Sequence, residues 1–135
     1  MATQTEEFLR NHPRDVSGDI ETLKTCVERL AACAQACLAC ADACLGERDV
    51  ADLVRCIQLD LDCADVCTAA ERVLTRRTAP DIQLHRILLE TCVRYCQECA
   101  RECDRHADMH DHCRLCADTC RLCEDACRQV LARVA

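Results

Sequence analysis

Seventeen cysteines recur along the chain at intervals that place them on single faces of helices. Thirteen of the sixteen gaps between successive cysteines are 3, 4 or 7 residues long. Residues three and four apart lie above one another on an α-helix, whereas one face of a strand needs gaps of two. The other gaps, of 12, 25 and 10 residues, divide the cysteines into four groups. The sequence therefore predicts four helices, each with one cysteine stripe.

Residues that favour helix ends agree with this division. Ser17 is a suitable N-cap for the first long helix, and Gly46 is suited to follow its last turn. The other helix starts are expected at Asp49, at the segment 78–81 with Pro80, and at Asp108 or Asp111. The predicted helices cover roughly residues 18–45, 49–77, 79–105 and 109–133, with a short N-terminal helix at about 3–11.

Helices of this length, joined by short turns, pack as antiparallel neighbours. We therefore expect an all-α fold, an up-down-up-down antiparallel four-helix bundle that forms one domain over residues 1–135. Two Gly and two Pro leave little material for hairpins, which supports helix over sheet. One Phe, one Tyr and no Trp mean that cysteine replaces much of an ordinary core.

Charge and segment composition exclude several classes of partner and favour a cytoplasmic location. The formal net charge is −7, with acidic and basic residues mixed and no basic block, which argues against nucleic acid. No apolar run reaches the length of a membrane span, and no signal peptide is evident at the N-terminus. In a reducing cytoplasm, thiols this dense are expected to be reduced and metal-binding rather than paired as disulfides.

Thiolates are soft ligands that favour Cu(I), Zn(II), Cd(II) and iron–sulfur clusters. Zinc prefers closed sets of four ligands, and the continuous cysteine stripes do not divide into such sets. Iron–sulfur clusters are usually held by cysteines in loops of particular spacing. Cu(I) accepts two or three thiolates, and one sulfur can bridge two ions. The spacing therefore favours many Cu(I) ions, with a metallothionein-like zinc or cadmium store and an iron–sulfur or thiol redox protein as alternatives.

Charge balance sets the expected number of ions. Seventeen buried thiolates would repel one another without cations, so the metal-free thiols should stay mostly protonated. About one Cu(I) per thiolate would leave the core near neutral, a capacity on the order of 15–20 ions. Such a stoichiometry indicates storage or sequestration, and we expect no enzymatic activity.

The cysteine motifs resemble those of the cytosolic members of the bacterial copper storage protein family. The likeness runs from residue 22 to residue 134, through CxxxCxxCxxxC at 33–44 and 92–103 and CxxCxxxCxxCxxxC at 113–127. The second helix has fewer cysteines, at 56, 63 and 67. The resemblance implies a four-helix bundle that binds Cu(I) in its core and assembles as a homotetramer. A chaperone that donates or accepts copper is a further expected partner.

The predicted metal ligands are the stripe residues and the residues that extend the stripes. His106 and His110 continue the third and fourth stripes towards their connecting turn, which we expect to be the mouth of the bundle, and Met109 lies between them. Asp60 fills the stripe between two cysteines of the second helix, where a buried carboxyl needs a partner. The cysteines are Cys26, Cys33, Cys37, Cys40, Cys44, Cys56, Cys63, Cys67, Cys92, Cys96, Cys99, Cys103, Cys113, Cys116, Cys120, Cys123 and Cys127.

The remaining positions suggest a closed end and a partner surface. Beyond the cysteines the stripes continue as an expected apolar plug of Leu74, Leu88, Leu89, Val130 and Leu131. A second apolar stripe runs along the second helix and another along the fourth, and these residues either flank the core or form an oligomer contact: Leu53, Ile57, Leu61 and Ala64, and Leu115 and Leu122. Three histidines lie off the stripes and are interpreted as surface residues: His12, His85 and His112.

Overall fold

The fold was obtained as a computed structural model, which describes residues 1–14 and 18–133. In chain order the elements are α1 (Gln4–Arg10), α2 (Ile20–Leu45), the 3-10 turn η1 (Val50–Leu53), α3 (Val54–Thr75), α4 (Ile82–Asp104) and α5 (Asp111–Arg133). The described residues contain no β-strand. The all-α prediction is confirmed.

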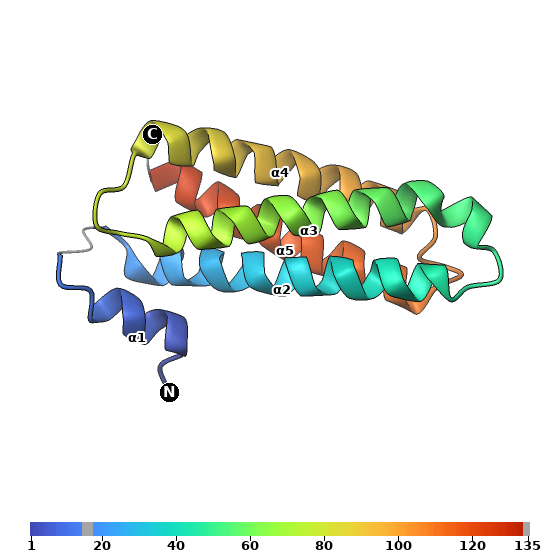
Figure 1. The fold of residues 1–135 in the computed structure, drawn as a ribbon, viewed down its shortest axis with the longest axis horizontal. Helices are drawn as coiled ribbons and strands as arrows, with labels where there is room; N and C mark the ends of the chain where they lie inside the picture. The colour runs from blue at the N-terminus through green and yellow to red at the C-terminus, as the bar shows by residue number, and fades with distance from the viewer. Residues whose placement is uncertain (15–17, 134–135) are drawn as a thin grey trace.

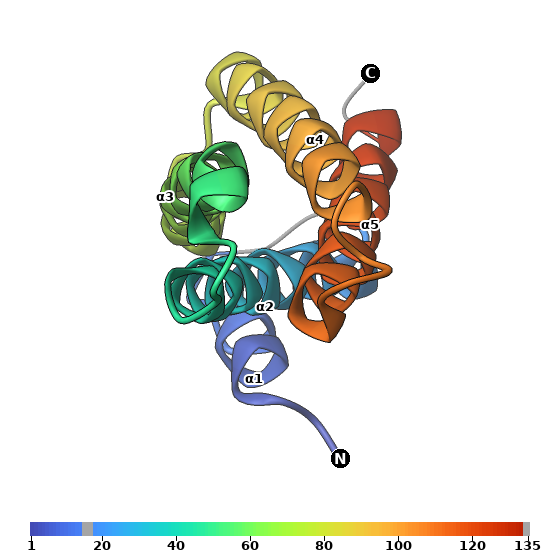
Figure 2. The same ribbon diagram turned by 90° about the vertical axis from the view of Figure 1, so that its right-hand side faces the viewer.

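The four long helices form an elongated bundle in which each helix runs antiparallel to the next in sequence (Figure 1). Viewed along the bundle, α2, α3, α4 and α5 follow one another around the axis (Figure 2). In this ring, α2 packs against α3 and α5, and α4 also packs against α3 and α5. The α2–α3 and α4–α5 turns therefore lie at the same end of the bundle, which we call the mouth.

Side-chain caps begin two of the long helices. The Asp19 side chain accepts a hydrogen bond from the Thr22 amide at the start of α2. The expected cap for this helix, Ser17, lies outside the described residues. Asp81 accepts from the Leu84 amide at the start of α4, so Pro80 precedes the cap instead of lying in the first turn.

The second long helix differs most from its expected bounds. The 3-10 turn η1 comes first, and α3 runs from Val54 to Thr75. Asp49 precedes η1 but makes no capping hydrogen bond. Its carboxylate instead accepts from His110 Nε2 at 3.0 Å, so a contact across the mouth replaces the local one.

The short helix α1 packs on the outside of α2. Thr3 caps it, and Leu9 turns into the core with 4% of its surface exposed. Ion pairs of Arg10 with Glu21 and of Lys24 with Glu6 lie beside this apolar contact. Ion pairs at the surface contribute about 0–1 kcal/mol each, so the buried leucine is the main anchor of α1.

Aliphatic packing is concentrated at the end opposite the mouth. Leu74 and Leu89 are fully buried there. Three partly buried residues pack against the same core: Leu88, Val130 and Leu131. Fully burying a leucine side chain stabilises a fold by about 1.5–3 kcal/mol, which offsets part of the weaker packing of a core built from cysteine.

The expected second apolar stripe is not a single surface. Leu53 and Ala64 are buried in the core, and Ile57 is partly buried against it, so these three residues belong to the core and its flank rather than to a partner surface. By contrast, Leu61, Leu115 and Leu122 are exposed, at 44%, 57% and 48%.

Candidate metal centre

All seventeen cysteines are buried, and all are free thiols. They come from all four long helices and form one column along the bundle axis. Sulfur atoms from different helices approach closely: Cys33 Sγ lies 3.8 Å from Cys120 Sγ, and Cys56 Sγ lies 3.6 Å from Cys103 Sγ. The helices thus bring together thiols that are far apart in sequence.

The thiols form overlapping groups of potential ligands. In at least five of these groups, four ligand atoms lie within 4.8 Å of one another. Cys33 and Cys63 belong to two of these groups, and so do Cys37 and Cys120. At least three of the groups consist of cysteine alone: Cys33, Cys63, Cys67 and Cys96; Cys33, Cys37, Cys63 and Cys120; and Cys37, Cys99, Cys116 and Cys120. Shared members suit bridging sulfurs better than separate tetrahedral sites.

Asp60 lies in the core, where the stripe pattern placed it, and is fully buried. Its Oδ1 accepts hydrogen bonds from the thiols of Cys99 at 3.1 Å, Cys116 at 3.4 Å and Cys103 at 3.7 Å. The thiols of α4 and α5 therefore supply the partner that a buried carboxyl requires. Cys40, Asp60, Cys103 and Cys116 also form one of the potential metal-binding groups.

Burial governs the protonation of these groups in the metal-free protein. Removal from water, with the nearby Cys116 sulfur as the second cause, raises the pKa of Asp60 to about 8. Burial likewise raises the pKa of the Cys113 thiol to about 12, and it raises the pKa of Cys44. The core is therefore mainly neutral and protonated at neutral pH, and a bound cation must displace protons from it.

Two predicted mouth histidines lie at the mouth and are hydrogen-bonded to carboxylates. His106 Nε2 lies 3.0 Å from Glu102 Oε2, and that glutamate side chain is 8% exposed. His110 has a carboxylate at each ring nitrogen: Glu47 Oε2 lies 2.6 Å from Nδ1, and Asp49 Oδ2 lies 3.0 Å from Nε2. The hydrogen bond with Asp49, strengthened by the negative charge of Glu47, raises the pKa of His110.

His112 is the functional candidate that the stripe pattern missed. It was interpreted as a surface residue, but its ring lies between the thiol column and the mouth. Its Nδ1 is 3.5 Å from Cys40 Sγ and 3.6 Å from Cys113 Sγ, and its Nε2 is 3.0 Å from Glu47 Oε2. Cys40, Cys44, His112 and Cys113 form a potential metal-binding group. His112 lies one residue before Cys113, in the first turn of α5, and from this position its ring points towards α2.

The other candidates lie away from the thiols or at the opposite end. Met109 is 71% exposed in the turn between α4 and α5. His12 is partly buried and lies 3.4 Å from the Thr78 hydroxyl. His85 was interpreted as a surface residue, which is wrong, because it is only 7% exposed. Burial, with Arg77 nearby, lowers the pKa of His85.

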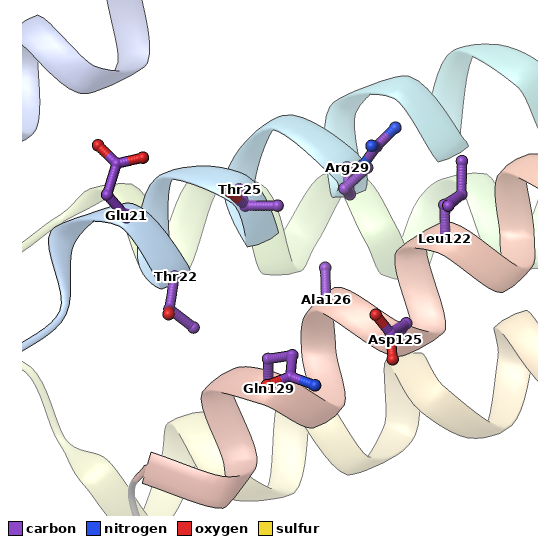
Figure 3. Close-up of a pocket in the computed structure, with 8 residues that line it drawn as sticks. All are labelled: Glu21, Thr22, Thr25, Arg29, Leu122, Asp125, Ala126 and Gln129. Carbon is purple, nitrogen blue, oxygen red and sulfur yellow. The ribbon is translucent and has the colours of Figure 1, made fainter.

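An open groove between α2 and α5 is a separate feature of the surface. It has a volume of about 300 Å³ and no cysteine in its lining. Figure 3 shows the side chains of Thr25 and Arg29 on one wall and those of Leu122 and Asp125 on the other. The candidate ligands are therefore enclosed by the helices rather than lining this groove.

Fold and site together define a class of protein, a helical bundle whose interior is a column of reduced thiols suited to soft metal ions. The chain belongs to the copper storage protein family, whose sequence profile matches residues 19–132. No helix among the described residues is long and apolar enough to span a membrane. A comparison with curated protein sequences gives no match.

Solved structures of one bacterial protein are similar to this chain. The copper storage protein Ccsp from Streptomyces lividans, loaded with 10 copper equivalents, is 52% identical over 96% of this chain and 98% of that chain, with a TM-score of 0.94. A second structure describes copper loading, with five coppers, to a cytosolic copper storage protein from the same organism. It is 54% identical over 83% of this chain and 93% of that chain, with a TM-score of 0.82.

Proposed function

We propose that this protein stores Cu(I) in the cytoplasm by binding many ions to the thiolates of its bundle core. The observation that carries the proposal is the set of overlapping groups of buried, reduced cysteines. Membership of the copper storage protein family and the copper-loaded relatives support the choice of metal. The protein would hold copper without chemical turnover.

The geometry of the column favours Cu(I) over zinc. Zinc sites in proteins are closed tetrahedra with four ligands of their own. In the thiol column one cysteine belongs to more than one group, so neighbouring tetrahedra would compete for it. Cu(I) is satisfied by two or three bridging thiolates, and each bound ion neutralises one of them. A full column would hold on the order of 15–20 ions, about one per thiolate.

The ligand set that we propose is the seventeen cysteines together with Asp60 and His112. Asp60 offers a carboxylate oxygen among the thiols of Cys103 and Cys116, and His112 offers Nδ1 beside those of Cys40 and Cys113. These two residues add oxygen and nitrogen ligands near the mouth end of a sulfur column.

Copper would enter at the mouth. His106 and His110 lie there with side chains 15% and 10% exposed, and the exposed turn residue Met109 adds a soft sulfur outside them. The opposite end is filled by aliphatic side chains such as Leu74 and Leu89, which offer no ligand. Ions would therefore pass from the outer histidines to His112 and then to the thiols.

A homotetramer and a copper-delivering protein are the proposed partners. Exposed leucines recur seven residues apart on two neighbouring helices: Leu38 and Leu45 on α2, and Leu115 and Leu122 on α5. Leu122 also lines the groove shown in Figure 3. Leu115→Arg should weaken self-association measured by light scattering, whereas Leu84→Arg, at an exposed position on α4, should leave it unchanged. Equal masses for the two variants would remove this face from the interface.

The central test is a titration of the reduced, metal-free protein with Cu(I) in the presence of a chromophoric Cu(I) chelator. Saturation on the order of 15–20 ions per chain is expected. Saturation at four ions or fewer, or retention of Zn(II) against an equal concentration of free Cu(I), would contradict the proposal.

The direction of loading needs a kinetic test. The double variant His106→Ala/His110→Ala should take up Cu(I) more slowly in a stopped-flow experiment while it reaches the same capacity. His12→Ala is the matched control, because this histidine lies near the closed end beside Thr78. Equal loading rates for the wild type and the double variant would show that copper does not pass the two histidines.

A further inference from the structure

One carboxylate oxygen at the mouth serves two histidines. Glu47 follows the C-cap residue Gly46 in the turn between α2 and η1. Its Oε2 lies 2.6 Å from His110 Nδ1 and 3.0 Å from His112 Nε2. The two rings stack with their centroids 5.3 Å apart and their planes inclined by 18°. Glu47 thus holds a pair of parallel imidazoles above the thiol column.

The direction of these hydrogen bonds fixes where the protons lie. An ionised carboxylate only accepts hydrogen bonds, so the Nε2–H of His112 must be the donor to Glu47. In the neutral ring Nδ1 then carries the lone pair. That lone pair faces Cys40 Sγ at 3.5 Å and Cys113 Sγ at 3.6 Å. In metal-bound histidines, one ring nitrogen usually donates a hydrogen bond to a carboxylate while the other nitrogen coordinates the metal. His112 has this arrangement, with the thiols of the potential metal site beside Nδ1.

The outer ring is held differently. Both nitrogens of His110 face carboxylates, Nδ1 that of Glu47 and Nε2 that of Asp49. In this arrangement His110 has no nitrogen directed at a thiol, whereas His112 has one. The two rings therefore have different tasks, and the oxygen of Glu47 is the atom that they share.

We propose that Glu47 is a positioning residue that orients His112 for the first copper ion bound at the Cys40–Cys44–His112–Cys113 group. The inference rests on the proposed function, since it concerns the order in which a copper store fills. Glu47 touches no thiol of this group itself. It acts by keeping the proton of His112 on Nε2 and by fixing the plane of the ring between α2 and α5.

Two substitutions separate this role from a general structural one. Glu47→Ala removes the acceptor, and Glu47→Gln keeps the volume and one acceptor oxygen but removes the negative charge. Asp52→Asn is the matched control, because it removes one negative charge from an exposed position on η1 at the same end of the bundle. Far-UV circular dichroism establishes that each variant is folded.

The readouts are the tautomer of His112 and the affinity for the first copper ion. Two-dimensional ¹H–¹⁵N NMR of the metal-free protein should show the Nε2–H form in the wild type and in Asp52→Asn. A population with the proton on Nδ1 is expected in Glu47→Ala, and a smaller one in Glu47→Gln, because the amide oxygen can still accept from Nε2–H. Competition with a Cu(I) chelator, at less than one ion per chain, should give an affinity reduced about 10–100-fold in Glu47→Ala and less in Glu47→Gln. The capacity at excess copper should equal that of the wild type.

Each result decides the matter. If Glu47→Ala matches the wild type in tautomer and in first-ion affinity, the inference is wrong while copper storage stands. An equal loss of affinity in Asp52→Asn would overturn it as well, because the effect would then be one of charge alone. If the wild type itself takes up four ions or fewer, the proposed function fails, and this inference fails with it.

Discussion

Replacing Asp60 with asparagine should stabilise the metal-free protein, and increasingly so as the pH rises. Asp60 is fully buried, and its pKa is raised to about 8. In the unfolded chain an aspartate has a pKa of about 3.9. Above about pH 4 unfolding therefore releases a proton, and the folded state loses stability as the pH rises until the folded pKa is passed. Asparagine has the same shape and no proton to release.

The size of the effect follows from the difference in pKa. Each unit of difference is worth about 1.4 kcal/mol, so the buried carboxyl costs the folded state about 4 kcal/mol at pH 7. Between pH 5 and pH 7.5 the stability advantage of Asp60→Asn should grow by about 3 kcal/mol. That is a large part of the 5–15 kcal/mol that typically separates folded from unfolded domains. The thiols of Cys99 and Cys116 can still donate to the asparagine oxygen.

The assay is urea denaturation of the reduced, metal-free protein, followed by far-UV circular dichroism at several pH values. The quantity of interest is the difference in unfolding free energy between variant and wild type, because the titrations that both proteins share cancel. Asp65→Asn, an exposed position on the same helix, controls for removal of one negative charge. A difference for Asp60→Asn that stays flat with pH, or that falls as the pH rises, would refute the reasoning.

Three further predictions concern the closed end, the mouth and the metal-free fold. Leu89→Ala should lower the unfolding free energy measured in urea by about 2–5 kcal/mol while copper capacity is retained. Leu84→Ala, at a residue 63% exposed, should cost far less. Equal losses would contradict the assigned packing. His110 should titrate above the ordinary pKa of 6.5 in an NMR pH titration. Asp49→Asn should lower the midpoint of that titration, because Asp49 is the main cause of the raised pKa. An unchanged midpoint would contradict this assignment. Removing copper with a strong chelator should leave the far-UV circular dichroism spectrum helical, because capped helices and the aliphatic end do not depend on metal, and a coil spectrum would disprove this.

The cysteine spacing was sufficient to predict the bundle and the thiol core. Intervals of three and four are typical of one helical face, and four such faces can be buried together only by turning inward. The same reasoning placed Asp60 inside, since it continues the stripe between Cys56 and Cys63. It also identified Leu74 and Leu89 as buried residues beyond the last thiols. These features depend on local periodicity, which a sequence displays directly.

The arrangement at the mouth depends on contacts between distant segments, and the sequence did not show it. Asp49 has the position of a helix cap, yet its carboxylate binds His110, 61 residues further along the chain. His112 lies one residue from Cys113, which on a regular helix is about 100° away from the stripe. At the mouth, where α5 begins, such a side chain can still reach the thiol of Cys40 on α2. Glu47 offered no pattern at all, because a single carboxylate in a turn is ordinarily solvated.

Because the buried thiols start out protonated, filling this core is an exchange of one monovalent cation for another. Each Cu(I) that binds releases about one proton, so the charge of the interior stays nearly constant from empty to full. The net charge of the protein, formally −7 when every carboxyl group is counted as ionised, should then change little with the degree of loading. Native gel mobility that does not change with copper content would be the visible sign. A partner could not sense the copper content of this protein by long-range electrostatics and would have to recognise it at the mouth, where copper would take the place between His112 Nδ1 and the thiols of Cys40 and Cys113.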